Sequence, residues 1–378
     1  MAVAAPTSQI IFSCRLLQQL LRRNEENVFI SPAGTGLALG MVAAGAKGQT
    51  LAALEHVLGV DAKLAASRAK RLFASLDTLP PGLAVHIANS LWAASGVPLA
   101  AHYVAAVMES YRSQARNVDF TRPGTVTLIN DWVARATHGQ IRDAVNQIDP
   151  RSPLVLVNAI YFYGSWQDPF DPADTLDHEF TMASGGITQV RLMSKRGEFD
   201  YADNEDLQAI RLPYKHGRFD LLVVLPREPI PAAAFDEIAT PNSLARILAS
   251  LEERSGTFRM PKVRLAYAAD LTFELSQMGM AQAFASDADF TGLFNQNIPA
   301  FISAVATKTR LEIDETGTTA SASTVVEMSL SASISEPSPP FEMTVDRPFL
   351  IGLTERESDL VLFIGVIGDP TATAPSYG

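Results

Sequence analysis

The sequence of 378 residues contains a single cysteine, Cys14, so no internal disulfide can form. The fold must therefore be held by its core in whichever compartment the protein occupies. The sequence also lacks a run of 18 apolar residues, the length that a membrane-spanning helix requires, and we expect a soluble chain without a membrane partner. No basic segment precedes an apolar stretch near the first residue, so no signal peptide is visible. Both a cytoplasmic and a secreted location stay open.

Basic residues are in the minority, with 30 lysines and arginines against 41 aspartates and glutamates and a net charge of −11. This balance disfavours binding to a phosphate backbone, and we expect no nucleic-acid partner. The six histidines are scattered without the spacing of a zinc helix, so we expect no metal, and no cofactor motif stands out. A G-x-S-x-G motif is missing as well, which argues against a serine hydrolase.

Hydrophobic periodicity predicts a mixture of helices and strands. Apolar residues spaced three and four apart predict helices over residues 10–21, 32–44, 51–58 and 128–137. Short apolar runs predict strands over residues 154–162, 209–212, 219–225, 257–265, 347–353 and 360–367, with a further helix near residues 270–284. Because the two kinds of element interleave without regular alternation, we expect an α+β fold. Length alone is compatible with two or three domains or with one large domain.

One segment, residues 316–340, differs from the rest, because 18 of its 25 residues are Ser, Thr, Ala, Gly or Pro. A connection of this length inside a compact chain calls for a functional or a disorder explanation. A mobile linker is the simpler interpretation. However, the alternate positions Thr318, Ala320, Ala322 and Thr324 are all small, and no proline occurs before residue 337, so the segment could also become a strand.

Ten segments spread over the chain resemble the serpin superfamily, in an order and spacing typical of an inhibitory member of the prokaryotic type. They are NVFISPAGTGLALGMVAAGAKGQT (27–50), ANSLWA (88–93), INDWVARATHGQIRD (129–143), LVNAIYFYGSWQDPF (156–170), IRLPY (210–214), MPK (260–262), MGMAQAFASDADFTGL (278–293), LEIDETGTTASAS (311–323), DRPFL (346–350) and LFIGVIGDPT (362–371).

The resemblance implies a serpin fold: a single domain over residues 1–378 with about three β-sheets, eight or nine helices and an exposed reactive-centre loop at residues 316–340. It implies a monomeric protease inhibitor and not an enzyme. A serine protease, or a cysteine protease, would cleave the loop, which would then insert into the main sheet and trap the covalent acyl-enzyme. A non-inhibitory serpin with a binding or chaperone-like role is the alternative.

By the same resemblance, Glu315, Gly317 and Thr318 form the hinge of the loop, followed by the small residues Ala320 and Ala322. In the family the scissile bond commonly follows the fourteenth residue after the hinge glycine. The candidate bond residues are then Ser331 and Ala332, with Leu330 and Met328 as alternatives, whereas counting back from Pro348 reaches as late as Pro337. No lysine or arginine occurs in residues 311–346, which disfavours a trypsin-like target and favours an elastase-, subtilisin- or chymotrypsin-like one.

The resemblance also assigns residues to the control of sheet opening. Ser31 and Asn158 match the polar cluster beneath the centre of the main sheet, called the shutter. Trp166 matches the tryptophan at the top of the sheet, called the breach, although an ordinary core aromatic would fit as well. Two positions depart from the family pattern, because Gly34 replaces a second shutter serine and Thr307 replaces the usual histidine. We therefore expect a rebuilt polar contact between Asn158 and Thr307.

Overall fold

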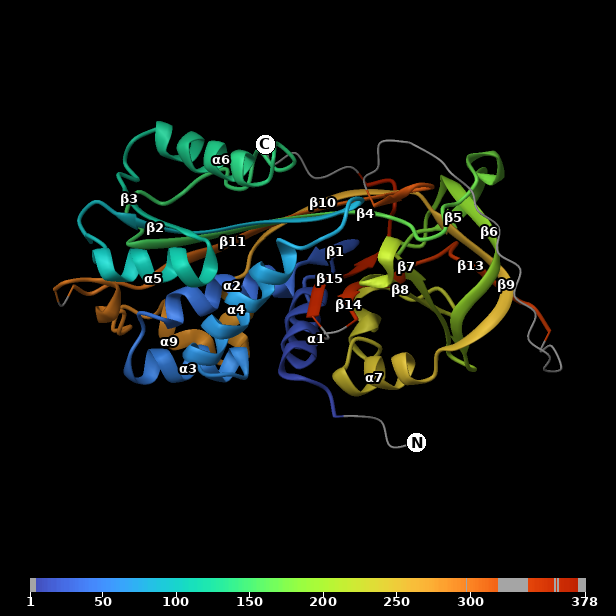
Figure 1. The fold of residues 1–378 in the computed structure, drawn as a ribbon, viewed down its shortest axis with the longest axis horizontal. Coiled ribbons are helices and arrows are strands. Elements are labelled where there is room, and N and C mark those ends of the chain that lie inside the picture. Colours follow the sequence, from blue (N-terminus) through green and yellow to red (C-terminus); the bar gives the residue numbers. More distant parts are fainter. Residues whose placement is uncertain (1–4, 297, 319–338, 357, 359, 373–378) are drawn as a thin grey trace.

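Figure 1 shows the computed structural model of the chain, which describes residues 5–296, 298–318, 339–356, 358 and 360–372. A long, twisted sheet extends along the molecule, and a second sheet lies toward one end of it. One helix covers the outer face of the long sheet, whereas most of the other helices gather on its inner face (Figure 1). The expected α+β class is confirmed.

The predicted helices are all present to within a few residues at their ends, and three further helices of the described residues, α4 (Ala62–Leu76), α5 (Ala101–Tyr111) and α7 (Pro241–Ala249), were not predicted. The predicted ones are α1 (Ser8–Leu21), α2 (Pro32–Ala43), α3 (Gly48–Leu58), α6 (Gly124–Ala136), α8 (Thr272–Leu275) and α9 (Ala281–Phe284). The last two are the ends of the helix expected near residues 270–284. A π-helical turn joins them, in which Gly279 has a positive φ of 115°.

The long sheet has six strands, and its central strands position the candidate site. In order across the sheet they are β10 (Val263–Asp270), β11 (Ile302–Asp314), β12 (Gly317–Thr318), β4 (Leu154–Ser165), β2 (Leu83–Ala94) and β3 (Gln114–Val118). Strands β4 and β11 are parallel, and β12 is antiparallel to both of them.

The second sheet has nine strands. They are β1 (Asn27–Ile30), β15 (Leu360–Ile367), β14 (Phe349–Glu355), β8 (Phe219–Pro226), β7 (Leu207–Pro213), β6 (Ile187–Asp203), β9 (Glu252–Pro261) and β13 (Phe341–Thr344), with β5 (Leu176–Thr181) beside β6. Strand β6 is 17 residues long and pairs with β5, β7 and β9 along different parts of its length. The strands of the described residues therefore form two continuous sheets, where the resemblance implied about three.

The single strand predicted over residues 257–265 is instead two strands, β9 and β10, in different sheets. The break falls directly after Pro261, which has no backbone N–H to continue a ladder. Lys262 lies between the two strands, and its backbone N–H bonds to the carbonyl oxygen of Arg191. An apolar run alone does not reveal such a change of sheet.

Alternate side chains of β4 enter two separate cores. Leu156 and Ile160 belong to the main core on the inner face of the long sheet. Val157 and Tyr161 belong to a smaller core that includes residues of α6. Because side chains along a strand alternate between faces, any strand added beside β4 would also present one set of side chains to each core.

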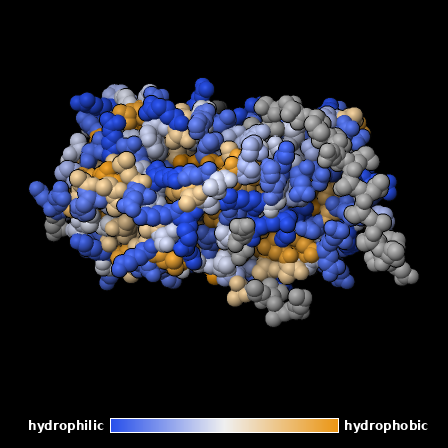
Figure 2. Space-filling view, viewed as in Figure 1, coloured by the Kyte–Doolittle hydropathy of each residue, from blue (hydrophilic) through white to orange (hydrophobic). Residues whose placement is uncertain are grey.

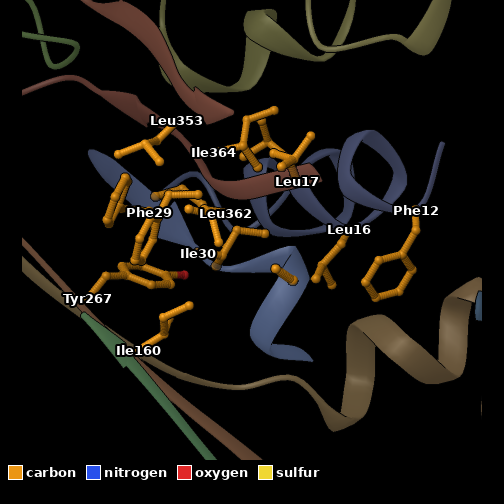
Figure 3. Packing of buried hydrophobic residues seen from close by; sticks show 14 of the residues in the cluster. Phe12, Leu16, Leu17, Phe29, Ile30, Ile160, Tyr267, Leu353, Leu362 and Ile364 are labelled. Carbon is orange, nitrogen blue, oxygen red and sulfur yellow. The ribbon is translucent and has the colours of Figure 1, made fainter. Parts of the chain in front are cut away.

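The main core joins the two sheets and α1. Figure 3 shows Phe29 and Ile30 of β1 beside Leu362 of β15, with Tyr267 of β10 and Ile160 of β4 facing them. Helix α2 runs through this core and is buried on nearly every side, which its uniformly apolar sequence allows.

The face of the molecule shown in Figure 2 is largely hydrophilic, and its hydrophobic side chains gather in several separate groups. Within the described part of the chain, no helix has the length and apolar character needed to cross a membrane.

Candidate functional site

The two central strands of the long sheet separate at one end, and β12 lies in the opening. Pairing between β4 and β11 runs from Leu154 beside Ile302 to Tyr161 beside Arg310. Beyond that point Thr318 lies between Gly164 of β4 and Ile313 of β11 and pairs with both. The chain thus leaves β11, turns, and begins a strand that points back down the gap between β11 and β4.

The turn between β11 and β12 requires a glycine at position 317. Gly317 has a positive φ of 151°, and a Cβ atom there would lie 2.1 Å from the carbonyl oxygen of Gly164. The carboxylate of Asp314 accepts hydrogen bonds from the backbone N–H of Thr316 at 2.8 Å and of Gly317 at 3.2 Å. This pattern of an aspartate bonding to amides two and three residues later fixes the reversal of the chain.

Trp166 holds the same turn from the side of β4. Its backbone N–H bonds to the carbonyl oxygen of Thr316 at 3.0 Å, and its indole N–H bonds to that of Asp314 at 2.9 Å. The indole is 3% exposed and stacks on Tyr214, with ring centroids 4.5 Å apart. The tryptophan is therefore both a core aromatic and a hydrogen-bonding partner of the turn.

Thr318 is buried, with 1% exposure, and its hydroxyl lies 2.6 Å from the phenolic oxygen of Tyr214. Burial raises the pKa of Tyr214, so the phenol stays protonated and one of the two hydroxyl groups donates to the other. The small side chain of Thr318 therefore fits beside Tyr214, and its hydroxyl group has a hydrogen-bond partner.

Glu315 fixes the turn to neighbouring segments. Its carboxylate lies 2.7 Å from Nζ of Lys262 and accepts a hydrogen bond of 2.8 Å from the hydroxyl of Thr175. Burial by itself raises the pKa of Glu315, but the hydrogen bonds from Lys262 and Thr175 outweigh it and lower the pKa below 4.5. The carboxylate is therefore ionised at neutral pH. We call Trp166, Tyr214, Glu315, Gly317 and Thr318 the hinge cluster.

A second polar cluster lies farther down the gap, where β4 and β11 are still paired. The Thr307 hydroxyl donates to the side-chain oxygen of Asn158 at 3.2 Å, which is the contact expected from the sequence. The side-chain amide of Asn158 in turn donates to the side-chain oxygen of Asn89 on β2 at 2.5 Å. The amide nitrogen of Asn89 is buried and has no hydrogen-bond partner among the described residues.

Gly34 makes room for Asn158 in this cluster. A Cβ atom on Gly34 would lie 2.5 Å from the side-chain nitrogen of Asn158, so the asparagine occupies the space that a serine side chain would need. Ser31 lies one helical turn earlier, where its hydroxyl accepts from the backbone N–H of Gly34 and donates to the carbonyl oxygen of Leu362. We call Gly34, Asn89, Asn158 and Thr307 the shutter cluster.

Several residues expected at the site fall where the structure gives no description. The expected hinge residues Glu315, Gly317 and Thr318 are described and lie together at the turn after β11. Asn158 and Thr307 are in contact, and Ser31 bonds to Gly34. The remaining expected positions, Ala320, Ala322, Met328, Leu330, Ser331 and Ala332, lie outside the described residues.

Sequence reasoning missed four residues that contact the predicted ones. Tyr214, Lys262 and Asn89 lie in the segments IRLPY, MPK and ANSLWA. These segments contribute to the resemblance to serpins, but no role was assigned to the three residues. Thr175 lies in none of the ten segments, and only the folded chain brings it to Glu315.

The chemistry of the site is that of hydrogen bonding and strand pairing. Among the described residues, no group of three or more His, Cys, Asp or Glu side chains could hold a metal ion. Burial raises the pKa of the Cys14 thiol to about 12, which makes it a poor nucleophile at neutral pH.

Comparison with known protein families gives a match over nearly the whole chain. A family model described as "Serpin (serine protease inhibitor)" matches residues 7–370. The chain belongs to the serpin family, a family of protease inhibitors rather than enzymes. An uncharacterized serpin-like protein of Thermococcus kodakarensis is 33% identical over 365 residues, which are 94% of this chain and 83% of the relative.

Solved structures show the same fold. The chain resembles tengpin, a thermophilic serpin in its native state, with a TM-score of 0.84, 26% identity, and coverage of 95% of this chain and 94% of the other. It also resembles human thyroxine-binding globulin in complex with thyroxine, with a TM-score of 0.86, 25% identity, and coverage of 97% and 98%. The serpin fold implied by the sequence is therefore confirmed.

Proposed function

We propose that this chain is a single-domain serine protease inhibitor that acts as a suicide substrate. A protease would cleave within residues 316–340, and the segment after the hinge would enter the long sheet as a new strand, carrying the covalently attached protease with it. The observation that supports this proposal best is β12. Its two residues already lie at the open end of the gap between β11 and β4 and pair with both strands.

Strand direction favours extension of β12. Strands β11 and β4 form a parallel ladder along the gap, whereas β12 is antiparallel to each of them. A longer β12 would replace one parallel ladder with two antiparallel ladders. Because antiparallel pairing is slightly more stable per residue and the number of backbone hydrogen bonds would rise, insertion would lower the free energy of the sheet.

The observed register defines how much of the loop the gap would accept. In an antiparallel pair, each step forward on one strand is one step back on the other. Continuing from Thr318 opposite Gly164, residue 328 would come opposite Leu154, where the pairing of β4 with β11 starts. The gap would thus take residues 319–328. A bond between Ser331 and Ala332 would leave this whole segment free to insert, with residues 329–331 as a short connection to the protease.

The same register brings one loop residue to the shutter cluster. Residue 324 would lie opposite Asn158 on β4 and opposite Thr307 on β11, which are now neighbours in the parallel ladder. Thr324 is six residues after Thr318, an even number, so its side chain would point to the same face of the sheet and toward the main core. Insertion would break the hydrogen bond between Asn158 and Thr307, and the Thr324 hydroxyl could bond to both side chains in its place.

The loop composition suits this path and suggests a target class. The side chains that would face the main core with Thr318 include Ala320, Ala322 and Thr324, which are small. Glu327 has the opposite parity and would come opposite Val155, on the side of the smaller core that includes residues of α6. Without lysine or arginine in residues 311–346, the loop fits an elastase-, subtilisin- or chymotrypsin-like protease, and a cysteine protease is a second possible target class.

The direct test is to mix the chain with one protease of each of these three types and to run the products on a denaturing gel. We expect a covalent complex that survives boiling in detergent, together with a cleaved chain. Mass spectrometry of the cleaved chain would identify the scissile bond, which we expect after Ser331, or after Leu330 or Met328. Complete turnover of the chain as an ordinary substrate by all three proteases would contradict the proposal.

The role of Thr324 can be tested separately by the substitution Thr324→Val, which removes the hydroxyl and keeps the shape. We expect the cleaved form to lose about 1 kcal/mol of stability relative to the cleaved parent, while the uncleaved form is unchanged. The matched control is Ser323→Ala, whose side chain would face the other side of the sheet. Equal effects of the two substitutions on thermal unfolding of the cleaved form would argue against the register.

A non-inhibitory binding role is the second candidate, because the fold also resembles thyroxine-binding globulin, which is described in complex with thyroxine. The two candidates differ in their response to loop cleavage. Insertion predicts a marked rise in the thermal unfolding midpoint after cleavage. A protein that only binds a ligand would show no rise and no covalent protease complex.

A further inference from the structure

A cavity of about 470 Å³ lies between α1, α2 and α4, beside the first residues of β15, and no member of the hinge cluster or the shutter cluster lines it. Apolar side chains form much of its wall, among them Phe12, Leu37, Leu58, Leu72 and Val361. Figure 3 shows the Phe12 ring projecting from α1 away from the group around Phe29. A volume of this size is in the range of sites that bind small organic molecules.

A buried hydroxyl group in the wall lacks a partner. Tyr111, at the end of α5, lines the cavity and is 2% exposed, and its phenolic oxygen has no hydrogen-bond partner among the described residues. Burial raises the pKa of Tyr111, so the hydroxyl remains protonated and can donate. The phenolic oxygen has less than 1 Å² of accessible surface, so it lies behind the cavity wall, and the tyrosine contributes its ring to the lining.

The charged groups of the wall are mainly cationic. Arg68, Arg71 and Arg218 line the cavity together with one carboxylate, Glu355. Glu355 pairs with Arg218 at 2.6 Å. Arg68 and Arg71 bond only to the hydroxyls of nearby serines, and neither forms an ion pair with a described residue. Being three residues apart on α4, they lie on the same face of that helix. Two unpaired guanidinium groups beside an apolar wall, on a chain of net charge −11, favour an anionic head group with an apolar body.

We propose that this cavity binds a small amphipathic organic acid. Its hydrocarbon part would pack against Phe12, Leu37 and Leu72, and its acidic group would bond to Arg68 and Arg71. The site makes no use of the hinge, the shutter or the loop, so it does not depend on the inhibitory function proposed above.

The probe is decanoate, used below its micellar concentration and titrated into the full chain by isothermal titration calorimetry. We expect saturable binding of one decanoate per chain and a rise of the thermal unfolding midpoint with decanoate concentration. Decylammonium, which has the same chain length and the opposite charge, is the control ligand and should bind at least about tenfold more weakly. Absence of decanoate binding, or equal binding of decylammonium, would overturn the proposal.

Two substitutions on α4 separate a specific contact from general electrostatic attraction. Arg71→Gln removes a charge that lines the cavity, and we expect about tenfold weaker decanoate binding. Lys63→Gln removes a charge from an exposed position of the same helix outside the cavity, and we expect a change of less than about twofold. Equal effects of the two substitutions would show that decanoate binds to the surface only.

Tyr111→Phe is a control for the lining of the cavity, because it removes a hydroxyl that lies behind the wall. Because the hydroxyl has no partner in the free protein, its removal should leave the unfolding midpoint unchanged or raise it. Decanoate affinity should change by less than about twofold, because the hydroxyl is not exposed to the cavity. A loss of affinity of about tenfold or more would place decanoate deeper than the cavity and would contradict the proposed position. Leu37→Trp, which fills the cavity, should abolish decanoate binding, and retained binding in a folded variant would place the ligand elsewhere.

Discussion

The hinge cluster lies at the open end of the gap between β4 and β11 and the shutter cluster lies farther down the same gap, but the two are built differently. At the hinge, the turn is held by an ionised carboxylate, two aromatic rings and several backbone hydrogen bonds. At the shutter, neutral amides and hydroxyls form a short chain of hydrogen bonds that leaves one buried donor of Asn89 unpaired. The two residues of β12, where the proposed insertion would begin, are thus fixed firmly, whereas the centre of the gap is closed by contacts that can exchange partners.

The largest effect should come from Thr318→Arg at the hinge. Thr318 is buried beneath Tyr214, and an unpaired buried charge there costs about 3 kcal/mol or more. Insertion should then stall at its first residue, and the yield of covalent protease complex should fall at least about tenfold in favour of simple cleavage. Gel analysis of complex against cleaved chain measures this ratio. Thr318→Ser, which keeps the hydroxyl, is the control, and unchanged inhibition by the arginine variant would contradict the insertion mechanism.

At the shutter, the informative pair is Gly34→Ala and Gly36→Ala, because both glycines lie in α2. A Cβ atom on Gly36 would meet only the Phe12 ring at 4.0 Å, so this variant should gain about 0.5 kcal/mol from helix propensity. On Gly34 the added atom would collide with Asn158, and we expect a loss of about 1–2 kcal/mol. Urea unfolding of the uncleaved chain measures both values. Similar changes in the two variants would show that Asn158 moves aside without penalty.

A smaller effect is expected from the hydrogen bond between Tyr214 and Thr318. In a double-mutant cycle with Tyr214→Phe and Thr318→Val, the coupling energy should be about 1 kcal/mol in the free energy of unfolding. Additive effects of the two substitutions would mean that this contact does not hold β12 in place, and the contrast between a firmly held hinge and a loosely held shutter would weaken.

The smallest effect is on the pH dependence of stability. It distinguishes the hinge cluster, which contains a titratable carboxylate, from the shutter cluster, which contains none. The pKa of Glu315 is lowered in the folded chain, so its contacts with Lys262 and Thr175 stabilise the fold above pH 4.5, and this contribution is lost as the pH falls further. Glu315→Gln should therefore destabilise the chain by about 0.5–1 kcal/mol at pH 7 and by progressively less below pH 4.5. Thermal unfolding as a function of pH measures the difference.

Thr307→Val is the matched variant at the shutter, because no member of that cluster titrates. Its effect on stability should be the same at pH 4 and at pH 7. The family pattern has a histidine at this position, which would titrate between these values. A pH-dependent effect of Thr307→Val would show that a titratable group outside the cluster acts on it.

The sequence predicted the class of fold, about half of the element positions and the contact between Asn158 and Thr307, because each depends on local periodicity or on segments typical of serpins. It could not predict that β9 and β10 belong to different sheets, since an apolar run looks the same in either. It also missed the partnership of Glu315 with Lys262 and Thr175. These residues are far apart in the sequence, and only the folded chain brings them together.

If the loop inserts as proposed, the two residues of β12 would also influence how long the uncleaved state lasts. Starting a new strand is usually slow, because a chain loses much conformational freedom before the first pair of hydrogen bonds forms. Here that first pair already exists. If the rest of the loop can follow, the uncleaved chain is protected from spontaneous insertion by the height of an activation barrier and not by its equilibrium free energy. The lifetime of the active form would then be set by how often β4 and β11 separate below Tyr161 and Arg310.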